Sequence, residues 1–310
     1  PHQRVLINER RDPNPFFHLF EALWMLGGRN DLAFPQKFIS TFGQFSDDGQ
    51  TLHGAYGARW RSYFGYDQLD MIISALRNDP KTRRAVLAMW DGGAIADESQ
   101  LRHRLGDLHV AESGGKDVPC NTHIYFDTVG GHLNMTTVAR GLDVILGAYG
   151  ANAVHMSILH EYVASLTGLP MGVFRQYANN YHVYRDLYPR LKLDKEGLLA
   201  LASSVRQSDP YSSSKMRLVP LMNGGEEKAF HNDLREFLSC VDRHAPDFSA
   251  ETPFFTSVVR PMWSAWRAWK EGDFDGADVA ARNIVAYDWF IAAQSWLEIR
   301  RKRREEKVNG

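Results

Sequence analysis

The sequence predicts a fold that combines helices with a mixed β-sheet and ends in a helix-rich portion. Two segments with alternating apolar and polar residues meet at Gly130-Gly131, a pattern typical of a β-hairpin. Segments 65–78 and 148–168 instead repeat their apolar residues with helical spacing. From about 190 to 310 the pattern is helical and rich in tryptophan. We therefore expect an α/β (α+β) chain in which residues 1–310 form a single domain.

The composition is that of a globular protein and excludes several classes. The 310 residues carry a formal net charge of −1, which gives no reason to expect a nucleic acid as partner. The apolar runs fall well short of the roughly 20 residues that span a bilayer, so no membrane segment is predicted. Two cysteines, Cys120 and Cys240, provide no disulfide framework, and we expect a reducing, cytoplasmic compartment.

The first predicted helix, from Phe16 to Leu26, is apolar on nearly every side, which indicates burial. Glu21 is its exceptional residue. A buried carboxylate must be paired, hydrogen-bonded or protonated. The alternative is that Glu21 faces solvent on a narrow polar stripe with His18.

Residues 31–52 are loop-like and contain several phenylalanines, after which glycines bracket a tyrosine in Gly54-Ala-Tyr-Gly-Ala-Arg-Trp-Arg61. The glycines around Tyr56 allow the backbone to approach another group closely. In isolation this motif is weak.

Two basic residues, Arg83 and Arg84, precede a predicted buried strand that runs to Trp90. Adjacent arginines at a strand end suit an oxyanion such as phosphate, although such pairs also occur at solvated edges. Segment 91–117 is rich in glycine and charge, and we expect a surface loop with a short helix and no motif.

A single cysteine stands behind a proline in Asp117-Val-Pro-Cys-Asn-Thr-His123. Cys120 is a candidate nucleophile only if a neighbour favours its thiolate, and Arg140, one strand later, is suited to that role. The alternative is a buried structural thiol. For Cys240, in a predicted helix, we expect a structural role.

A last predicted strand runs from Gly172 to Tyr184 and ends in Asn179-Asn-Tyr-His-Val-Tyr184. The C-terminal helix carries the basic run Arg300-Arg-Lys-Arg-Arg304, which we interpret as a solvated helix end.

Taken in order, these segments resemble motifs of the thymidylate synthase superfamily, which includes the pyrimidine-nucleotide C5 hydroxymethylases. The resemblance spans more than half of the chain. It depends on several motifs that occur in the same order as in the family, since any one of them alone is weak. The matching segments are Glu21-Ala-Leu-Trp-Met-Leu26, Gly54-Ala-Tyr-Gly-Ala-Arg-Trp-Arg61, Asn78-Asp-Pro-Lys-Thr-Arg-Arg84, Pro119-Cys120, Arg140-Gly-Leu-Asp143 and His182-Val-Tyr184.

The resemblance implies a thymidylate synthase-like fold, with a large mixed sheet and a long buried helix, paired back to back in a homodimer with shared active sites. It also implies a reaction between a pyrimidine nucleoside monophosphate and 5,10-methylenetetrahydrofolate, without a metal. Cys120 would add to carbon 6 of the base, which makes carbon 5 nucleophilic towards the one-carbon unit. Arg140 would lower the pKa of this thiol.

Binding roles for the nucleotide follow from the same resemblance. Arg83 and Arg84, reaching across the dimer interface, would clamp the 5′-phosphate together with Arg140. His182 and Tyr184 would hold the sugar 3′-hydroxyl. The alternative for His182 is a core histidine.

Proton transfer and folate binding are assigned in the same way. Glu21 would relay protons to the ring through water, and Tyr56 would assist loss of the carbon 5 proton. Asp143 would bind the pterin, with Gly147 and Phe42 also at the folate. Packing or capping roles remain open for Tyr56 and Asp143.

Departures from the family motifs leave the substrate open. Asn121 replaces the family's histidine after the cysteine, and Gly141 replaces a serine, which leaves room beside the ribose. Asn152 matches the base-reading asparagine if one residue is inserted within 147–153. An amide can read uracil or, flipped, cytosine, with uracil slightly favoured.

Two features favour hydroxymethylation over methylation. The chain ends in a charged helix, where thymidylate synthases have a short apolar tail, and Phe42 stands near the family's tryptophan. A wetter site lets water add to the exocyclic methylene group. Gly54-Ala-Tyr-Gly57 and segment 147–152 also resemble the phage-type branch, which implies the cytoplasm of a bacterial cell or a phage-infected host.

We therefore predict a hydroxymethylase whose favoured substrate is dUMP, with dCMP or CMP as alternatives to it. The alternative within the fold is a true thymidylate synthase. The alternative from another class is an inactive nucleotide-binding or interaction module.

Overall fold

The computed structural model describes residues 4–5, 12–95, 103–104, 106–184 and 217–309. The chain divides into two compact units, which are described separately. The sheet unit comprises Glu21–Leu142 and Leu159–Tyr181, and the helical unit comprises Pro1–Phe20, Asp143–Ile158 and His182–Gly310. Both units contain discontinuous pieces of chain.

The sheet unit is built on a β-hairpin. Strands β4 (Asn121–Val129) and β5 (His132–Ala139) pair antiparallel, as predicted. Gly130 and Gly131 join them with positive φ angles of 60° and 79°, a conformation that glycine adopts without strain and that suits a two-residue hairpin turn.

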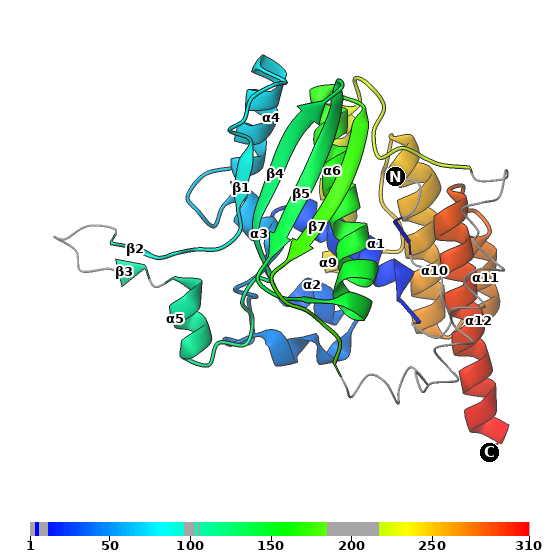
Figure 1. The fold of residues 1–310 in the computed structure, drawn as a ribbon. Helices are drawn as coiled ribbons and strands as arrows, with labels where there is room; N and C mark the ends of the chain where they lie inside the picture. The colour runs from blue at the N-terminus through cyan, green and yellow to red at the C-terminus, as the bar shows by residue number, and fades with distance from the viewer. Residues whose placement is uncertain (1–3, 6–11, 96–102, 105, 185–216, 310) are drawn as a thin grey trace, which may run out of the picture. The chain divides into compact units, whose positions relative to one another are not determined.

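Two further strands complete a four-stranded sheet of order β1-β4-β5-β7 (Figure 1). Strand β1 (Val86–Ala88) is antiparallel to β4, whereas β7 (Met171–Ala178) is parallel to β5. A parallel neighbour requires a crossover, which α6 (Asn152–Thr167) supplies. The mixed sheet with flanking helices confirms the predicted fold class.

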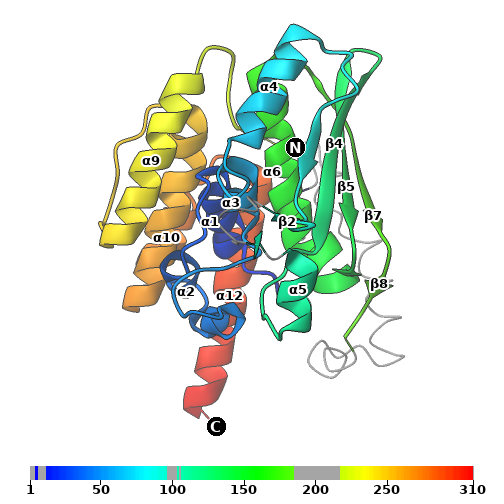
Figure 2. The same ribbon diagram turned by 90° about the vertical axis from the view of Figure 1, so that its left-hand side faces the viewer.

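The buried face of the sheet lies against the C-terminal half of α6, as Figure 2 shows. Apolar side chains from β4 and β5 alternate onto this face, including Ile124, Leu133 and Met135, none of which is exposed. The buried His160 ring bonds the Leu133 carbonyl oxygen at 2.7 Å through Nε2 and so ties the helix to the sheet.

Shorter elements surround this core in the sheet unit. In chain order they are α2 (Ala33–Gln36), the 3₁₀-helix η1 (Ser40–Phe45), α3 (Tyr56–Arg61), α4 (Gln68–Asn78), β2 (Ala94–Ile95), β3 (His103–Arg104) and α5 (Asp107–Glu112). The predicted loop 31–52 thus contains two short helices, while 91–117 holds the single short helix that was expected together with a small β-ribbon.

Helix α1 (Pro15–Leu26) is buried along its length, as its all-round apolar sequence predicts. Glu21 is only 9% exposed, and so is His18. The interpretation of these two residues as a solvent-facing stripe is therefore wrong. Burial, and not amphipathicity, explains the composition of this helix.

The helical unit packs α9 (Glu227–Arg243), α10 (Arg260–Glu271), α11 (Phe274–Ala281) and α12 (Tyr287–Asn309), with a π-helical turn η4 (Phe255–Val259) before α10 (Figure 1). Aromatic rings form its core: Phe16 lies 5.4 Å from Trp296, and Trp266 lies 5.8 Å from Trp296. The predicted helical character is confirmed for 217–309, and residues 190–216 lie outside the described part.

The basic run at the end of α12 is engaged in ion pairs. Arg300 and Arg303 both reach Asp12 Oδ2 at 2.6 Å, and Arg301 reaches Asp278 Oδ2 at 2.6 Å. These contacts tie the end of α12 to α11 and to the segment before α1. Three of the run's five residues are thus anchored, so its interpretation as a merely solvated helix end was incomplete.

Two other predicted elements differ in their bounds. The predicted helix 148–168 begins as a π-helical turn, η2 (Val144–Ala151), before α6. The predicted strand 172–184 is divided into β7 and the short β8 (Tyr181–His182), while Leu142–Asp143 forms β6. Among the described residues, no helix is both long and apolar enough to cross a bilayer.

Candidate functional site

Cys120 lies at the residue before β4, and the hairpin register brings Arg140 opposite it. The Arg140 backbone N–H donates to the Cys120 carbonyl oxygen at 2.9 Å, one step beyond the last pair of the β4–β5 ladder. The hairpin therefore brings together Cys120 and Arg140, which are twenty residues apart in the sequence. The thiol and the guanidinium predicted to act together belong to neighbouring strand ends.

Arg140 holds the segment that leads into the cysteine. Its Nε donates to the Pro119 carbonyl oxygen at 3.0 Å and its Nη2 to that of Val118 at 3.1 Å. The guanidinium also lies 5.8 Å from the centre of the Trp90 ring. The arginine is exposed, so it keeps access to an incoming anion while it fixes the loop.

Tyr56, the first residue of α3, contacts the same thiol. Its phenol group hydrogen-bonds with the Cys120 side chain and accepts from the backbone N–H groups of Cys120 and Asn121. Burial raises the pKa of Tyr56, and the neighbouring Cys120 and Asp117 raise it further. The phenol is therefore neutral and keeps its proton.

The Cys120 thiol is protonated in the free protein. Burial raises its pKa above the ordinary value; Arg140 acts in the opposite direction, and Asp117 adds to the increase. The predicted effect of Arg140 has the expected sign but does not outweigh burial. A group that accepts the thiol proton must therefore accompany formation of the thiolate.

Asp117 is a site residue that sequence reasoning missed. Its Oδ2 accepts from the Gly54 backbone N–H at 2.8 Å, and burial raises its pKa. A Cβ atom on Gly54 would lie 2.8 Å from Asp117 Oδ1 and 3.0 Å from the Pro119 nitrogen. The predicted close backbone approach at this glycine is thus observed. The sequence feature that could have identified Asp117 is its acidic side chain three positions before the cysteine.

Asn121 points a donor into the interior of the sheet unit. It is 1% exposed, and its Nδ2 has no hydrogen-bond partner among the described residues. An unpaired buried amide costs free energy, so such groups usually mark a ligand position or a strained site. The sequence signal for Asn121 was its position directly after the cysteine, where the chain departs from the motif that it resembles.

The remaining predicted residues of the sheet unit lie at different places on it. Arg83 and Arg84 are exposed just before β1, and Gly141 follows Arg140. Phe42 is partly buried in η1, with its ring 5.5 Å from that of Phe45. Of the predicted residues of this unit, Tyr56 and Arg140 are thus the ones that the described structure brings to Cys120.

The helical unit holds the other predicted residues. Asp143 caps η2 by accepting from the Leu146 backbone N–H, and its buried Oδ2 has no partner among the described residues. Capping, which sequence reasoning left open for Asp143, is thus observed for one carboxylate oxygen while the other is unused. His182 and Tyr184 lie together, with ring centres 5.0 Å apart.

The π-helical turn η2 contains Gly147 and ends immediately before Asn152, which begins α6 and is buried. Gly150 within it has non-helical angles, φ −113° and ψ −110°. One extra residue in a helix produces such a π-bulge, and π-bulges are frequent at functional sites. The inserted residue predicted within 147–153 stays a prediction.

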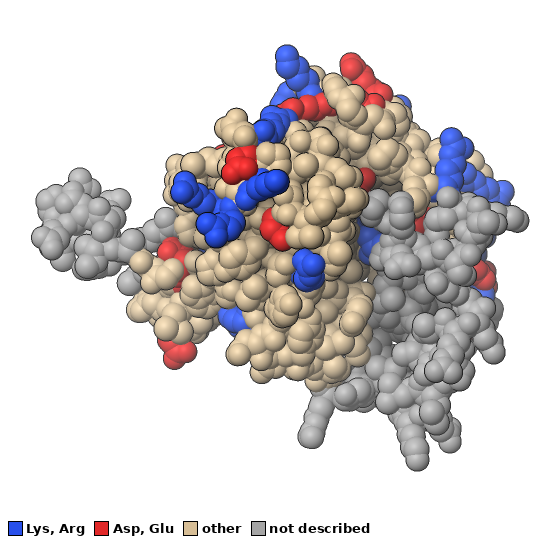
Figure 3. Space-filling view, turned by 45° about the horizontal axis from the view of Figure 1, so that its top comes forward, with Lys and Arg blue, Asp and Glu red and all other residues tan. Residues whose placement is uncertain are grey.

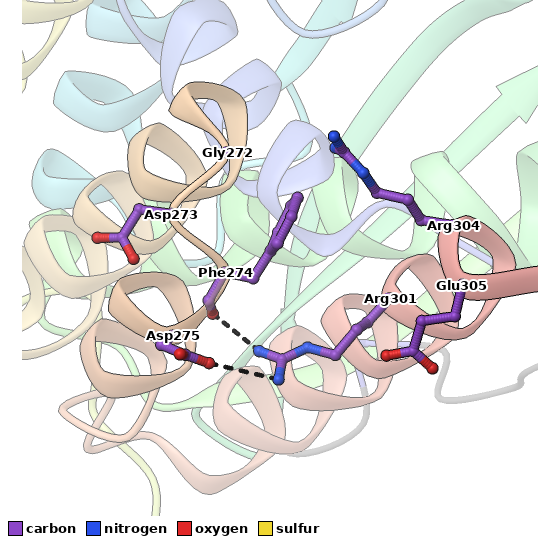
Figure 4. A pocket seen from close by; sticks show the side chains of 7 residues that line it. All are labelled: Gly272, Asp273, Phe274, Asp275, Arg301, Arg304 and Glu305. Atoms are coloured by element: carbon purple, nitrogen blue, oxygen red, sulfur yellow. Dashed lines mark hydrogen bonds and ion pairs between the residues drawn. The ribbon is translucent and has the colours of Figure 1, made fainter. Parts of the chain in front are cut away.

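Two cavities lie elsewhere in the described residues. One, of about 530 Å³, opens between the start of α11 and the end of α12 in the helical unit (Figure 4). Arg304 stacks 4.7 Å from the Phe274 ring there, and Arg301 donates to the Phe274 carbonyl oxygen. The other, of about 280 Å³, lies in the sheet unit beside His53 and Tyr63. None of the predicted site residues lines either cavity.

No group of three or more histidine, cysteine, aspartate or glutamate side chains within the described residues is arranged to hold a metal ion. The groups that converge on Cys120 are a phenol, a guanidinium and a carboxyl group. These suit proton transfer and the binding of an anionic, hydrogen-bonding substrate.

The model of the family described as thymidylate synthase matches residues 17–198. This span contains α1 from Phe17 onward, Tyr56, Cys120 and Arg140. The chain belongs to the thymidylate synthase family. This confirms the predicted resemblance and, with it, the prediction of a one-carbon transferase enzyme.

Two relatives of this thymidylate synthase family member bear the name deoxyuridylate hydroxymethyltransferase. That of Pseudomonas phage M6 is 40% identical over 312 residues, covering 99% of this chain and 83% of its own length. That of Bacillus phage SP01 is 31% identical and covers 61% of this chain and 48% of its own length. Among solved structures, thymidylate synthase A of Bacillus subtilis has a TM-score of 0.44 at 22% identity, covering 57% of this chain and 60% of that one.

Proposed function

We propose that this thymidylate synthase family member is a deoxyuridylate hydroxymethyltransferase, which makes 5-hydroxymethyl-dUMP from dUMP, 5,10-methylenetetrahydrofolate and water. The observation that carries the proposal is the similarity to the phage M6 enzyme of that name, which extends over 99% of the chain. The grouping of Cys120, Tyr56 and Arg140 supports it, because these side chains suit addition to a pyrimidine ring.

In the proposed reaction the Cys120 sulfur adds to carbon 6 of the uracil, and carbon 5 attacks the methylene carbon of the folate. Loss of the carbon 5 proton and departure of tetrahydrofolate leave an exocyclic methylene group on the base. Water adds to this group, and the sulfur leaves carbon 6. The folate keeps its oxidation state, whereas methylation would convert it to dihydrofolate.

Each residue near the cysteine has a role that its surroundings support. Arg140 favours the thiolate and contributes to binding the 5′-phosphate, with Arg83 and Arg84 of the partner protomer. Tyr56, whose phenol contacts the thiol, is proposed to assist loss of the carbon 5 proton from that position. Glu21, buried in α1, relays protons through water.

The helical unit supplies the remaining contacts in this proposal. The unpaired Oδ2 of Asp143 fits an N–H donor of the pterin, with Gly147 as a further folate contact. Phe42, in η1 of the sheet unit, is also proposed to contact the folate. Asn152 reads the uracil edge, while His182 and Tyr184 hold the sugar 3′-hydroxyl. Each of these contacts is a proposal about one side chain and is tested by its alanine variant.

A back-to-back homodimer fits the open face of the sheet. Val86, Tyr125, Val173 and Tyr177 are exposed on β1, β4 and β7, with Tyr177 60% accessible. Figure 3 shows that charged side chains are sparse over this side of the molecule and gather beside it. An exposed apolar surface of this kind suits pairing with a second copy.

The experiment that tests the reaction uses the nucleotide product. The protein is incubated with methylenetetrahydrofolate and, separately, dUMP, dCMP, UMP or CMP, and each product is weighed by mass spectrometry. A gain of CH₂O on dUMP, absent from the Cys120→Ala variant, is expected. A gain of CH₂ with formation of dihydrofolate would instead identify a thymidylate synthase, and no gain on any nucleotide would favour the inactive binding module.

Shared active sites are tested by mixing two inactive variants, Cys120→Ala and Arg84→Ala. In a heterodimer, one of the two sites combines the intact cysteine with the intact arginine, so activity returns on mixing. If the mixture stays inactive although light scattering shows exchange of protomers, the arginine does not cross the interface. The cytoplasmic location predicted from the cysteine content is part of this proposal and is tested by fractionation.

A further inference from the structure

A fully buried ion pair joins two segments of the sheet unit that lie 48 residues apart. Arg59 Nη1 donates to Asp107 Oδ2 and Arg59 Nη2 to Asp107 Oδ1, both at 2.8 Å. Neither side chain is exposed. Asp107 begins α5 within 91–117, the segment for which the sequence provides no motif, and Arg59 lies in α3 behind Tyr56.

Asp107 makes further hydrogen bonds that account for its burial. Its Oδ1 bonds His53 Nε2 at 2.7 Å, and its Oδ2 accepts from the Asp91 backbone N–H at 2.8 Å. Burial alone would raise the pKa of Asp107, but the bonds from His53, Arg59 and Asp91 lower it to about 2. The carboxylate is therefore charged throughout the pH range of enzyme activity.

Arg59 connects the ion pair to the backbone on both sides. Its Nη2 donates to the His53 carbonyl oxygen at 3.0 Å, and its Nη1 to the Met89 carbonyl oxygen at 2.7 Å. The guanidinium also lies 4.2 Å from the centre of the Tyr63 ring. A single buried charge thus fixes the start of α3 and the end of β1.

Both of these backbone segments carry groups of the site. The segment from His53 to Arg59 contains Tyr56, which bonds the Cys120 thiol, and Gly54, which bonds Asp117. Residues 89–91 include Trp90, whose ring lies beside Arg140. The ion pair bonds none of the reacting groups directly, yet it bonds the backbone just before Tyr56 and on both sides of Trp90.

We propose that Arg59 and Asp107 are positioning residues that hold Tyr56 and the Cys120 loop in reacting geometry, and that α5 serves to deliver Asp107. The assignment of Tyr56 and Cys120 as reacting groups rests on the proposed function. Buried ion pairs contribute little net stability compared with apolar side chains of the same volume, whereas they demand one arrangement of their neighbours. Such a pair suits a site in which a displacement of about 1 Å costs roughly 100-fold in rate.

The test compares Asp107→Asn with the double variant Arg59→Gln/Asp107→Asn. The single variant leaves a buried guanidinium without its counter-charge, so it loses both thermal stability and geometry. The double variant removes both charges and recovers most of the melting temperature. We expect kcat with dUMP to stay reduced by about 100-fold in both variants, with less than about a threefold change in KM, because the nucleotide is bound by other residues.

A matched control is Asp233→Asn in the helical unit. Asp233 is also buried and accepts from the Thr252 backbone N–H at 2.8 Å and from the Thr252 hydroxyl at 2.6 Å. This variant loses stability in the same way but keeps the wild-type kcat. If kcat instead follows the melting temperature across all three variants, the role of the ion pair is structural and the proposal is wrong.

A second readout does not need turnover. Alkylation of Cys120 by iodoacetamide, followed by peptide mass spectrometry, reports the environment of the thiol, with the buried Cys240 as internal reference. A looser loop buries the thiol less, and burial is what raises its pKa. We therefore expect the alkylation rate to rise about tenfold at fixed pH, because a decrease of one pKa unit increases the thiolate fraction about tenfold. An unchanged rate in both Asp107 variants overturns the proposal, even if the wild-type protein does not act on dUMP.

Discussion

The two cysteines of this chain lie in contrasting surroundings. Burial raises the pKa of both thiols. Cys240, inside α9, donates to the Ala245 carbonyl oxygen at 3.3 Å and is completely buried. Cys120 is only partly buried and lies beside a phenol, a guanidinium and a carboxyl group. Because Cys240 also has charged neighbours, Asp247, Arg243 and Arg267, access and the adjacent phenol distinguish Cys120 from it, and not charge alone.

The strongest test of this comparison replaces each cysteine in turn. Cys120→Ala removes the group that adds to the base, so turnover of dUMP should fall below detection while nucleotide binding persists. Cys240→Ala leaves a small cavity and should lower stability by about 1–2 kcal/mol with an unchanged kcat. Steady-state kinetics and thermal unfolding measure both effects, and equal losses of activity would contradict the distinction.

Removing the guanidinium should sharpen the contrast between the two thiols. In Arg140→Gln the positive charge that favours the Cys120 thiolate is lost, so its pKa rises further and the pH profile of alkylation moves upwards by about one unit. The profile of Cys240 should not move. A downward shift at Cys120 would show that Arg140 acts mainly by holding the loop carbonyl oxygens.

Replacing the neighbouring carboxyl group should have the opposite sign and a smaller size. In Asp117→Asn the charge that raises the Cys120 pKa is removed, while the amide oxygen still accepts from Gly54. The alkylation profile should move to lower pH by less than about one unit. The same iodoacetamide assay measures this, and a rise in the thiol pKa would exclude the proposed influence of Asp117.

A last expected effect concerns stability in acid. The pKa of Asp107 is about 2 in the folded protein, below its unfolded value of roughly 3.9. Its stabilising contribution is therefore complete above the unfolded pKa and is lost as the pH falls towards 2. Urea unfolding between pH 5 and 2 should show a shallower loss of stability in Arg59→Gln/Asp107→Asn than in the wild type, whereas Cys240→Ala should follow the wild-type slope.

Features confined to one helix or one hairpin could be predicted from the sequence. The apolar surface of α1 indicated the burial of Glu21, and the turn at Gly130-Gly131 joined the strands that bring Arg140 opposite Cys120. These arrangements follow from side-chain periodicity and turn chemistry, which act over a few residues. The glycine at 54 likewise indicated a close approach, although its partner was not identifiable.

Contacts between distant segments were decided by packing. The partner of Gly54 is Asp117, 63 residues away, and that of Arg59 is Asp107. No periodicity relates such positions, and 91–117 has no motif.

The sequence by itself therefore determined the family, the mixed fold and the pairing of Cys120 with Arg140. Only the tertiary structure decided that burial outweighs the guanidinium at the thiol, and that one buried ion pair holds its neighbours. The physical reason is that desolvation and long-range ion pairing depend on which segments pack together.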